Sequence, residues 1–309
     1  MEYKCTILRI SLVLLKTHLI YMDTQQLQAF VTVARLGSFS QAAEQLYLTQ
    51  PAISKRIDKL EQQLNARLFD RIGRHIHLTD AGMVLLPKAQ HILATLEDTS
   101  RELSNLSGRV EGELRIATSH HIGLHRLPPY LRAYQQAFPK VKLDIQFAES
   151  EVIYQGVLEG LWEIGIITLS PQPHKQLQQE VVWQDEMHFV CSPSHPLAIA
   201  QNVCLQDLGN YDALLSKPGT FTRELLNQRF DQAKVDLPVA TSTNNLDTLR
   251  MLASTGMGWS LLPHTLLNND ITAIASNIPT IVRQLGCVSH KQRSLSNPAQ
   301  QLMSLIQTL

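Results

Sequence analysis

Hydrophobic positions between residues 23 and 79 follow a helical period in three successive runs. The first run, around Leu27 and Phe30, ends at Gly37, and glycine readily ends a helix. The second begins after Ser38 and the third after Thr49, and both side chains suit a helix N-cap. The apolar stripe of the third run is Ile53, Ile57, Leu60 and Leu64. The pattern predicts three short helices on one core.

A hairpin and a long helix are expected next. Two short extended runs around Ile72-Gly73 predict the hairpin. The helix is expected from about Asp80 to Leu106, with Pro87 kinking its first turns. Its apolar seam repeats four and three residues apart over three heptads, at Leu85, Ala89, Ile92, Leu96, Thr99, Leu103 and Leu106. Such a seam indicates a coiled coil, and its simplest partner is the same helix of a second chain. Packing against its own domain is the alternative.

Extended and helical runs alternate after the linker "SGRVEG" (residues 107–112). The expected strands are Glu113–Thr118, Val141–Ala148, Ile164–Thr168, His188–Ser192, Asp212–Ser216, Val239–Ser242, Gly258–Leu262 and Ile281–Cys287. The expected helices are Gly123–Phe138, Val152–Leu161, Phe221–Ala233 and Leu246–Thr255. This order predicts an α/β region with largely parallel sheets, as one domain or two lobes.

The overall composition does not indicate one class of protein, and only single segments are informative. The 309 residues suffice for two or three domains, and 27 Lys and Arg balance 27 Asp and Glu. From Met22 to Thr79, seven basic residues against five acidic ones give a net charge of +2. Four distant cysteines without a CxxC pair argue against zinc or disulfides and favour a reducing, cytoplasmic setting. In residues 1–21 the longest apolar run is Leu12–Leu15, too short for a membrane span. We expect an upstream extension there, with Met22 as the functional start.

The third helix carries candidate DNA-reading chemistry opposite its apolar stripe. Gln50 can pair bidentately with adenine, and Ser54 and Lys55 can contact phosphate or base edges. Arg71 and Arg74 flank Gly73 at the hairpin tip, where a guanidinium group suits a narrow minor groove. The alternative for both features is a solvated surface. A dimerising seam beside them favours DNA, because dimeric helix-turn-helix proteins read two half-sites.

The segments "LQAFVTVARLGSFSQAAEQLYLTQPAISKRIDKLEQQLNARLFDR" and "LTDAG" resemble the winged helix-turn-helix of LysR-type transcriptional regulators. The resemblance extends over the chain after Met22 and is most specific in the first 80 matched residues. It implies a winged helix-turn-helix, a linker helix and an α/β co-inducer domain similar to type-2 periplasmic binding proteins. Many members have Arg at the position of Lys55, and a Lys there lacks the planar fork. The candidate DNA-binding residues are Ser38, Ser40, Thr49, Gln50, Pro51, Ser54, Lys55, Lys59, Arg71 and Arg74.

The family places its effector cleft between two lobes, at strand ends. In "RIATSHHIGLHRLPP" (residues 115–129) a strand runs into a helix start, and ligands of open α/β sheets bind off the carboxyl ends of strands. Helix starts also favour anions. The candidate effector-binding residues are Thr118, Ser119, His120, Glu149, Ser150, Thr168, Ser216, Thr220, Thr243 and Asn244. For any single hydroxyl the alternative is helix capping.

Other chemistry is weaker in this sequence. His121 and His125 are four residues apart beside His120, a spacing that suits a transition metal, an anionic ligand or a structural role. No further ligand lies nearby in sequence, so we expect no metal site. GxSxG, Walker A, GxGxxG and HExxH motifs are absent, which argues against an enzyme.

The sequence therefore predicts a DNA-binding transcriptional regulator controlled by a small-molecule effector, without a resident cofactor. The expected domains are residues 1–21 (extension), 22–79 (DNA binding), 80–108 (dimerising helix) and 109–309 (effector binding). Within the last, lobe I is expected at about 112–185 and 269–309, and lobe II at about 186–268. Operator DNA, a second or further copies of the chain and RNA polymerase are the expected partners. The alternative is a stand-alone solute-binding module, or a redox-sensing one using Cys191 and Cys204.

Overall fold

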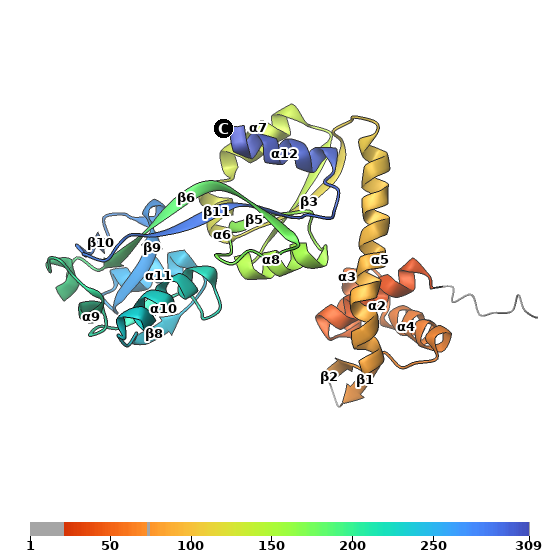
Figure 1. The fold of residues 1–309 in the computed structure, drawn as a ribbon, viewed down its shortest axis with the longest axis horizontal. Coiled ribbons are helices and arrows are strands. Elements are labelled where there is room, and N and C mark those ends of the chain that lie inside the picture. Colours follow the sequence, from red (N-terminus) through yellow and green to blue (C-terminus); the bar gives the residue numbers. More distant parts are fainter. Residues whose placement is uncertain (1–21, 73–74, 309) are drawn as a thin grey trace, which may run out of the picture. The chain divides into compact units, whose positions relative to one another are not determined.

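A computed structural model describes residues 22–72 and 75–308, without the side chains of Arg71, Ile72 and His75. The chain divides into two compact units, Met1–Thr99 and Ser100–Leu309 (Figure 1). The predicted extension, residues 1–21, and Arg74 at the hairpin tip lie outside the described residues.

The first unit contains the three predicted helices and the hairpin. These are α2 (Thr24–Leu36), α3 (Phe39–Gln45), α4 (Gln50–Leu64), β1 (Phe69–Ile72) and β2 (His75–Leu78). Gly37 ends α2 at φ 61°, a left-handed conformation that glycine adopts without strain. The Ser38 hydroxyl accepts from Gln41 N at 3.3 Å and caps α3. Thr49 is the N-cap residue of α4, as predicted, although its side chain makes no cap hydrogen bond.

The core of the first unit positions α4. Ile53, Ile57 and Leu60 are buried in it, and the Phe69 ring lies 5.3 Å from that of Phe30 and 5.9 Å from that of Phe39. The hairpin is thereby anchored to the helices by aromatic packing. Because one side of α4 is buried, its other side is available to a partner.

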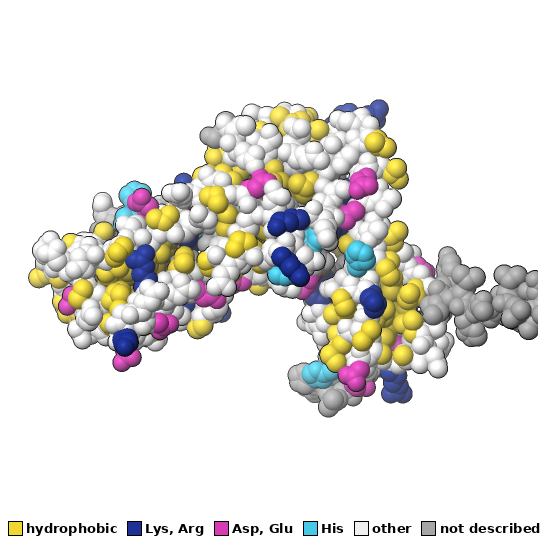
Figure 2. Space-filling model, viewed as in Figure 1, with side chains coloured by type: hydrophobic (Ala, Val, Ile, Leu, Met, Phe, Trp, Pro, Cys, Tyr) yellow, Lys and Arg dark blue, Asp and Glu magenta, His cyan; other side chains and the backbone are white. Residues whose placement is uncertain are grey.

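Helix α5 (Asp80–Asn105) runs through Pro87 without a break. Leu85 and Ala89 are buried in the core of the first unit, so the first two seam positions pack against their own domain. The later apolar positions are exposed, by 36% at Ile92, 49% at Leu96, 65% at Leu103 and 83% at Leu106. Figure 2 shows hydrophobic side chains at the surface along α5. The predicted seam is therefore divided between an internal part and an uncovered part.

The second unit is built on a nine-stranded sheet with the order β4-β3-β5-β11-β6-β9-β7-β8, and β10 pairs with β6. The strands are β3 (Gly112–Thr118), β4 (Val141–Phe147), β5 (Ile164–Thr168), β6 (Leu177–Cys191), β7 (Ala213–Leu215), β8 (Val239–Ser242), β9 (Trp259–Pro263), β10 (Thr272–Ala273) and β11 (Ile281–His290). Pairing is parallel within β4-β3-β5 and β9-β7-β8. The central strands β6 and β11 are antiparallel to each other and to their neighbours. The largely parallel sheet expected from the sequence is wrong at this centre, where two long strands cross between the lobes.

Helices cover both faces of this sheet. They are α6 (His120–His125), α7 (Pro128–Ala137), α8 (Ser150–Glu159), α9 (Leu205–Leu208), α10 (Phe221–Ala233), α11 (Leu246–Ser254) and α12 (Asn297–Thr308). In Figure 1, α7 and α12 lie on one face of the β3–β5 region and α8 on the other. The single helix expected over Gly123–Phe138 is wrong, because Pro128 and Pro129 lack the N–H groups needed to continue it. Helix α12 and the first part of β6 were not expected from the sequence.

Separate hydrophobic clusters define two lobes. Lobe I packs α7 and α12, and also α8, against β3, β5 and β11. Lobe II packs α10 and α11 against β7 and β9. Ile271 and Ile274 are buried in the clusters of lobe II. Both residues lie beyond the predicted lobe boundary at about residue 269, and the chain returns to lobe I along β11.

Candidate DNA-binding surface and effector cleft

Helix α4 presents its polar side chains to solvent. Gln50, Pro51, Lys55 and Lys59 are exposed, and Gln50 Nε2 donates to Ser54 Oγ at 3.1 Å. The first turn has Pro51 at a position where a missing N–H group is harmless. The helix thus exposes an amide and two ammonium groups beside a free N-terminus, which are groups suited to bases and phosphates.

The other DNA-binding candidates are more scattered. Thr49 and Ser40 are exposed, whereas Ser38 is half-buried and engaged as the cap of α3. The side chains of Arg71 and Arg74 lie outside the described part of the chain. The structure therefore gathers the candidates from Thr49 to Lys59 at one helix, and the two candidates of the wing stay predictions.

A cleft of about 340 Å³ lies between the two lobes of the second unit. It is lined by nine of the ten effector candidates, namely Ser119, His120, Glu149, Ser150, Thr168, Ser216, Thr220, Thr243 and Asn244. Thr118 is placed elsewhere: its hydroxyl donates to Ile166 O at 2.8 Å inside the sheet. A cleft of this size matches a small metabolite.

Three helices of eight or more residues begin at the cleft. Thr220 Oγ1 accepts from Arg223 N at 3.3 Å at the start of α10, and Asn245 Oδ1 accepts from Thr248 N at 2.9 Å at the start of α11. These two side chains act as helix caps, the alternative role for a cleft hydroxyl or amide. Helix α8 has no side-chain cap on its first turn, so its N–H groups remain available to an acceptor.

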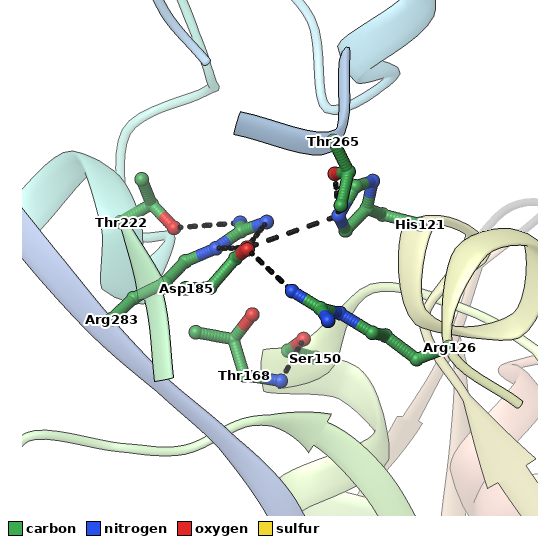
Figure 3. Close-up of polar contacts among 8 residues, drawn as sticks. All are labelled: His121, Arg126, Ser150, Thr168, Asp185, Thr222, Thr265 and Arg283. Carbon is green, nitrogen blue, oxygen red and sulfur yellow. Dashed lines mark hydrogen bonds and ion pairs between the residues drawn. The ribbon is translucent and has the colours of Figure 1, made fainter. Parts of the chain in front are cut away.

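An ion-pair cluster lies at the floor of the cleft, where its member Arg283 and the neighbouring His121 line the cavity; Figure 3 shows the contacts of the cluster. Asp185 of β6 is 1% exposed and Arg283 of β11 is 5% exposed. Asp185 Oδ2 lies 2.7 Å from Arg283 Nη2 and accepts from Arg283 Nε at 2.8 Å. Asp185 Oδ1 accepts from Arg126 Nη2 at 3.2 Å. One carboxylate therefore serves two guanidinium groups.

His121 does not add a charge to this cluster. Burial, followed by the nearby Arg283 charge, lowers the pKa of His121 to about 3, so its imidazole is neutral at pH 7. Its Nε2 lies 3.2 Å from Thr265 Oγ1 and 3.8 Å from Asp185 Oδ2. With His121 neutral, two positive charges face one negative charge. This three-residue cluster therefore carries a net positive charge, whereas the lining of the cleft also includes the carboxyl groups of Glu149, Glu151 and Asp247.

Two further contacts span the cleft. Arg283 Nη1 donates to Thr222 Oγ1 of α10 at 3.4 Å. Glu151 of α8 accepts from Phe221 N of α10 at 2.7 Å, and burial raises the pKa of the Glu151 carboxyl. Helices from the two lobes thus meet at the edge of the cleft. Any change in lobe spacing must alter these contacts.

The histidine pair lacks a third ligand. The rings of His121 and His125 lie 4.8 Å apart, and His125 is exposed. Among the described residues there is no group of three His, Cys, Asp or Glu that could hold a metal ion. This geometry leaves His121 as a neutral hydrogen-bonding group of the cleft.

Sequence reasoning missed the charged floor. Arg126, Asp185, Thr222 and Arg283 were not among the candidates. The available signal was a charged side chain inside each of two strand-like runs, "VVWQDEMHFV" and "IVRQLGCV", because buried charges occur where they are paired. Pairing them required knowing that β6 and β11 are neighbours.

The two cysteines bear on the redox-sensing alternative. Cys191 and Cys204 are free, and burial raises the pKa of the Cys191 thiol to about 11, which disfavours its reactive thiolate.

Within residues 22–72 and 75–308, each helix is too short or too polar to cross a membrane.

Comparisons with known families match both units. The model of the bacterial regulatory helix-turn-helix protein, lysR family, matches residues 24–83. The model of the LysR substrate binding domain matches residues 107–309. The latter alone spans about two thirds of the chain. The DNA-binding match disfavours a stand-alone solute-binding module.

Individual relatives agree. The chain is 29% identical over 282 residues to the HTH-type transcriptional regulator YeiE of Escherichia coli, covering 90% of this chain and 94% of YeiE. It is 65% identical over 108 residues to an HTH-type transcriptional regulator of Azotobacter vinelandii from the ibpB-leuC intergenic region, covering 35% of this chain and 75% of that protein.

Solved structures share the fold. A full-length OxyR variant from Pseudomonas aeruginosa superposes with a TM-score of 0.66 at 20% identity, covering 93% of this chain and 98% of that one. Full-length CbnR bound to its target DNA superposes with a TM-score of 0.59 at 22% identity, covering 93% and 99%. The chain therefore belongs to the LysR family of DNA-binding transcriptional regulators controlled by small-molecule effectors, which are not enzymes.

Proposed function

We propose that α4 reads the operator with Gln50, Pro51, Ser54 and Lys55, while Lys59 binds backbone phosphate. The support is the exposure of Gln50, Lys55 and Lys59 opposite the buried stripe of the same helix. Base-edge contacts give specificity and phosphate contacts give position. Ser40, Thr49, Arg71 and Arg74 complete the proposed contact set, with Ser38 at the helix start.

We further propose that the effector is a small anion bound in the interlobe cleft. The observation that carries this proposal is the floor, where two guanidinium groups share the single carboxylate of Asp185 beside a neutral His121. Buried Arg126 Nε has no hydrogen-bond partner among the described residues. An incoming carboxylate or phosphate would balance the excess charge. Hydroxyls of Ser119, Thr168, Ser216 and Thr243 would orient it.

Regulation then follows as a population shift. An anion that binds one lobe arrangement more tightly favours it in proportion to the difference in affinity. Exposed apolar positions of α5, from Ile92 to Leu106, would pair with a second copy, so that two α4 helices meet two half-sites. We infer a cytoplasmic homodimer or dimer of dimers, without catalytic activity, that acts on RNA polymerase.

The effector proposal is tested by thermal unfolding in a panel of succinate, benzoate and inorganic phosphate, with putrescine as a cationic comparison. A ligand of the folded state adds about 2.7 kcal/mol at one hundred times its Kd. We expect at least one anion, and not putrescine, to raise the unfolding midpoint.

Two matched variants localise that effect. Arg283→Lys keeps the charge but loses the planar fork, and should weaken binding of that anion at least fivefold. Arg229→Lys, whose guanidinium bonds to Pro279 O and Thr280 O outside the cleft, should bind it unchanged. Equal weakening in both variants, or stabilisation by putrescine alone, refutes an anion held at the cleft floor.

A further inference from the structure

The last turn of α5 belongs to the second unit and is held there by two asparagines. Asn105 Nδ2 donates to Leu295 O at 2.9 Å, and Asn105 Oδ1 accepts from Asn297 N at 2.8 Å. In return, Asn297 Nδ2 donates to Asn105 O at 3.3 Å and to Arg109 O at 3.1 Å. Each amide side chain binds the backbone of the other segment. Because hydrogen bonds are directional, this exchange restrains both the position and the rotation of the turn.

Charged groups extend the contact along the same helix. Arg101, one turn before Asn105, places Nε 3.8 Å from Glu163 Oε2. The Glu163 side chain is only 8% exposed and also accepts from Ser296 N. Glu102 Oε1 accepts from Ser294 Oγ at 2.6 Å. A nearly buried carboxylate needs partners, so α5 supplies part of the internal charge balance of lobe I.

Apolar packing does not hold this turn. Leu103 and Leu106 beside it are 65% and 83% exposed, in contrast to Leu85 and Ala89 near the other end of α5, which are buried. The attachment is therefore polar and specific in geometry. Such a contact can be released by a single amide substitution without opening a hydrophobic core.

The attachment lies at the end of a strand that also forms the cleft. Residues 294–297 follow β11, which carries Arg283 in the cleft floor, and lead into α12. Glu163 directly precedes β5, the lobe I neighbour of β11. One continuous chain segment thus contributes to both the cleft and the hold on α5.

We propose that Arg101, Glu102 and Asn105, with Glu163, Ser294 and Asn297, form a polar clamp that couples lobe I to the linker helix. A shift of lobe I on effector binding moves the last turn of α5 with it, and so reaches the DNA-binding unit. This coupling rests on the proposed effector function, whereas the clamp itself does not.

Hydrogen exchange of the full-length protein tests the clamp without any ligand. Asn105→Ala and Asn297→Ala should speed exchange of the amides of residues 103–106 at least tenfold. Ser104→Ala, an exposed neighbour, is the control. Alanine raises helix propensity at positions 104 and 105 alike, so faster exchange in Asn105→Ala alone cannot arise from propensity. Unchanged exchange in both asparagine variants overturns the clamp.

DNA binding tests the coupling, with a duplex selected in vitro by the wild-type protein. The probe is the anion of the panel above with the largest midpoint shift. Adding that anion changes the DNA affinity of the wild-type protein by some factor. In Asn297→Ala this factor should be at least threefold smaller, while the affinity for the anion stays unchanged. A full response despite fast exchange overturns the coupling. If no anion shifts the wild-type midpoint, the effector proposal fails, and fast exchange in the variants still supports the clamp.

Discussion

The two units use charge in opposite ways. On α4 the proposed DNA contacts Gln50, Lys55 and Lys59 are exposed and lie within ten residues of one another. At the cleft the charges of Asp185 on β6 and Arg283 on β11 are buried, and Arg126, just after α6, pairs with Asp185, so that the three are spread over about 160 residues of sequence. An exposed charge contributes little to stability and is free for a partner. A buried charge is costly unless paired. The charges at the cleft therefore affect the stability of the fold as well as ligand binding.

The largest difference in stability between a buried and an exposed charge should appear when the carboxylate of Asp185 is neutralised. Asp185→Asn removes the negative charge shared by Arg126 and Arg283, and should lower the free energy of unfolding by about 3–5 kcal/mol. Urea unfolding of the full chain measures it. Asp247→Asn, which breaks an exposed pair with Arg250, should cost about 1 kcal/mol or less. Equal costs would erase the contrast between buried and exposed charge.

The DNA-binding unit should show the reverse, with binding lost and stability kept. Gln50→Ala should cost about 1–3 kcal/mol of affinity for a selected duplex and relax specificity at one base pair. Lys59→Met should weaken all duplexes alike and reduce the salt slope by about 0.9. Fluorescence anisotropy across salt concentrations measures both. A sequence-selective loss in Lys59→Met would reverse the roles proposed for these two side chains.

Acid should weaken the effector unit through His121. Its pKa is about 3 in the folded chain and about 6.5 when unfolded, so the unfolded state binds the proton first. The contribution of His121 is therefore present above pH 6.5 and is lost as the pH falls toward 3. At pH 5 the loss in unfolding free energy amounts to about 2 kcal/mol.

Two glutamine variants isolate this effect. His121→Gln should flatten the fall in unfolding free energy between pH 6.5 and 4, while His125→Gln, exposed on the same helix, should leave it unchanged. An unchanged slope in His121→Gln would show that the histidine is not held neutral by burial.

The smallest expected effect is at Ser38, where substitutions separate a role in capping α3 from a role in DNA contact. As the cap of α3, Ser38→Ala should cost about 1 kcal/mol of stability and Ser38→Gly only a few tenths. A contact to phosphate would be lost equally in both. Equal DNA affinities in wild type and Ser38→Gly, with thermal unfolding as the stability measure, would assign Ser38 to folding alone.

Local pattern served the first unit well for a physical reason. Helix stripes, the Gly37 end and the Ser38 cap involve residues within a turn of one another, and these interactions are visible in sequence. The same pattern did not determine the partner of the α5 seam, since Leu85 and Ala89 are buried by their own domain. Periodicity shows which face is apolar but not what covers it.

In the second unit, candidates at strand ends were found because parallel strands place those ends together. Thr118 was the exception, since its hydroxyl bonds inside the sheet. The crossover of β6 and β11 was missed, because the first part of β6 contains many polar residues and gives little periodic signal. The antiparallel centre and the lobe boundary depended on that crossover.

The sequence by itself determined the family, the polar face of α4 and the set of polar side chains around the cleft, since each rests on local spacing or on a motif in register. Only the tertiary structure decided what lies beneath that set. Asp185, Arg283 and Arg126 meet because two distant strands pair and a short helix ends above them. The same holds for Asn105 and Asn297, which are 192 residues apart. Long-range pairing of buried charges and amides leaves no periodic trace, because its energy depends on geometry that only the folded chain creates.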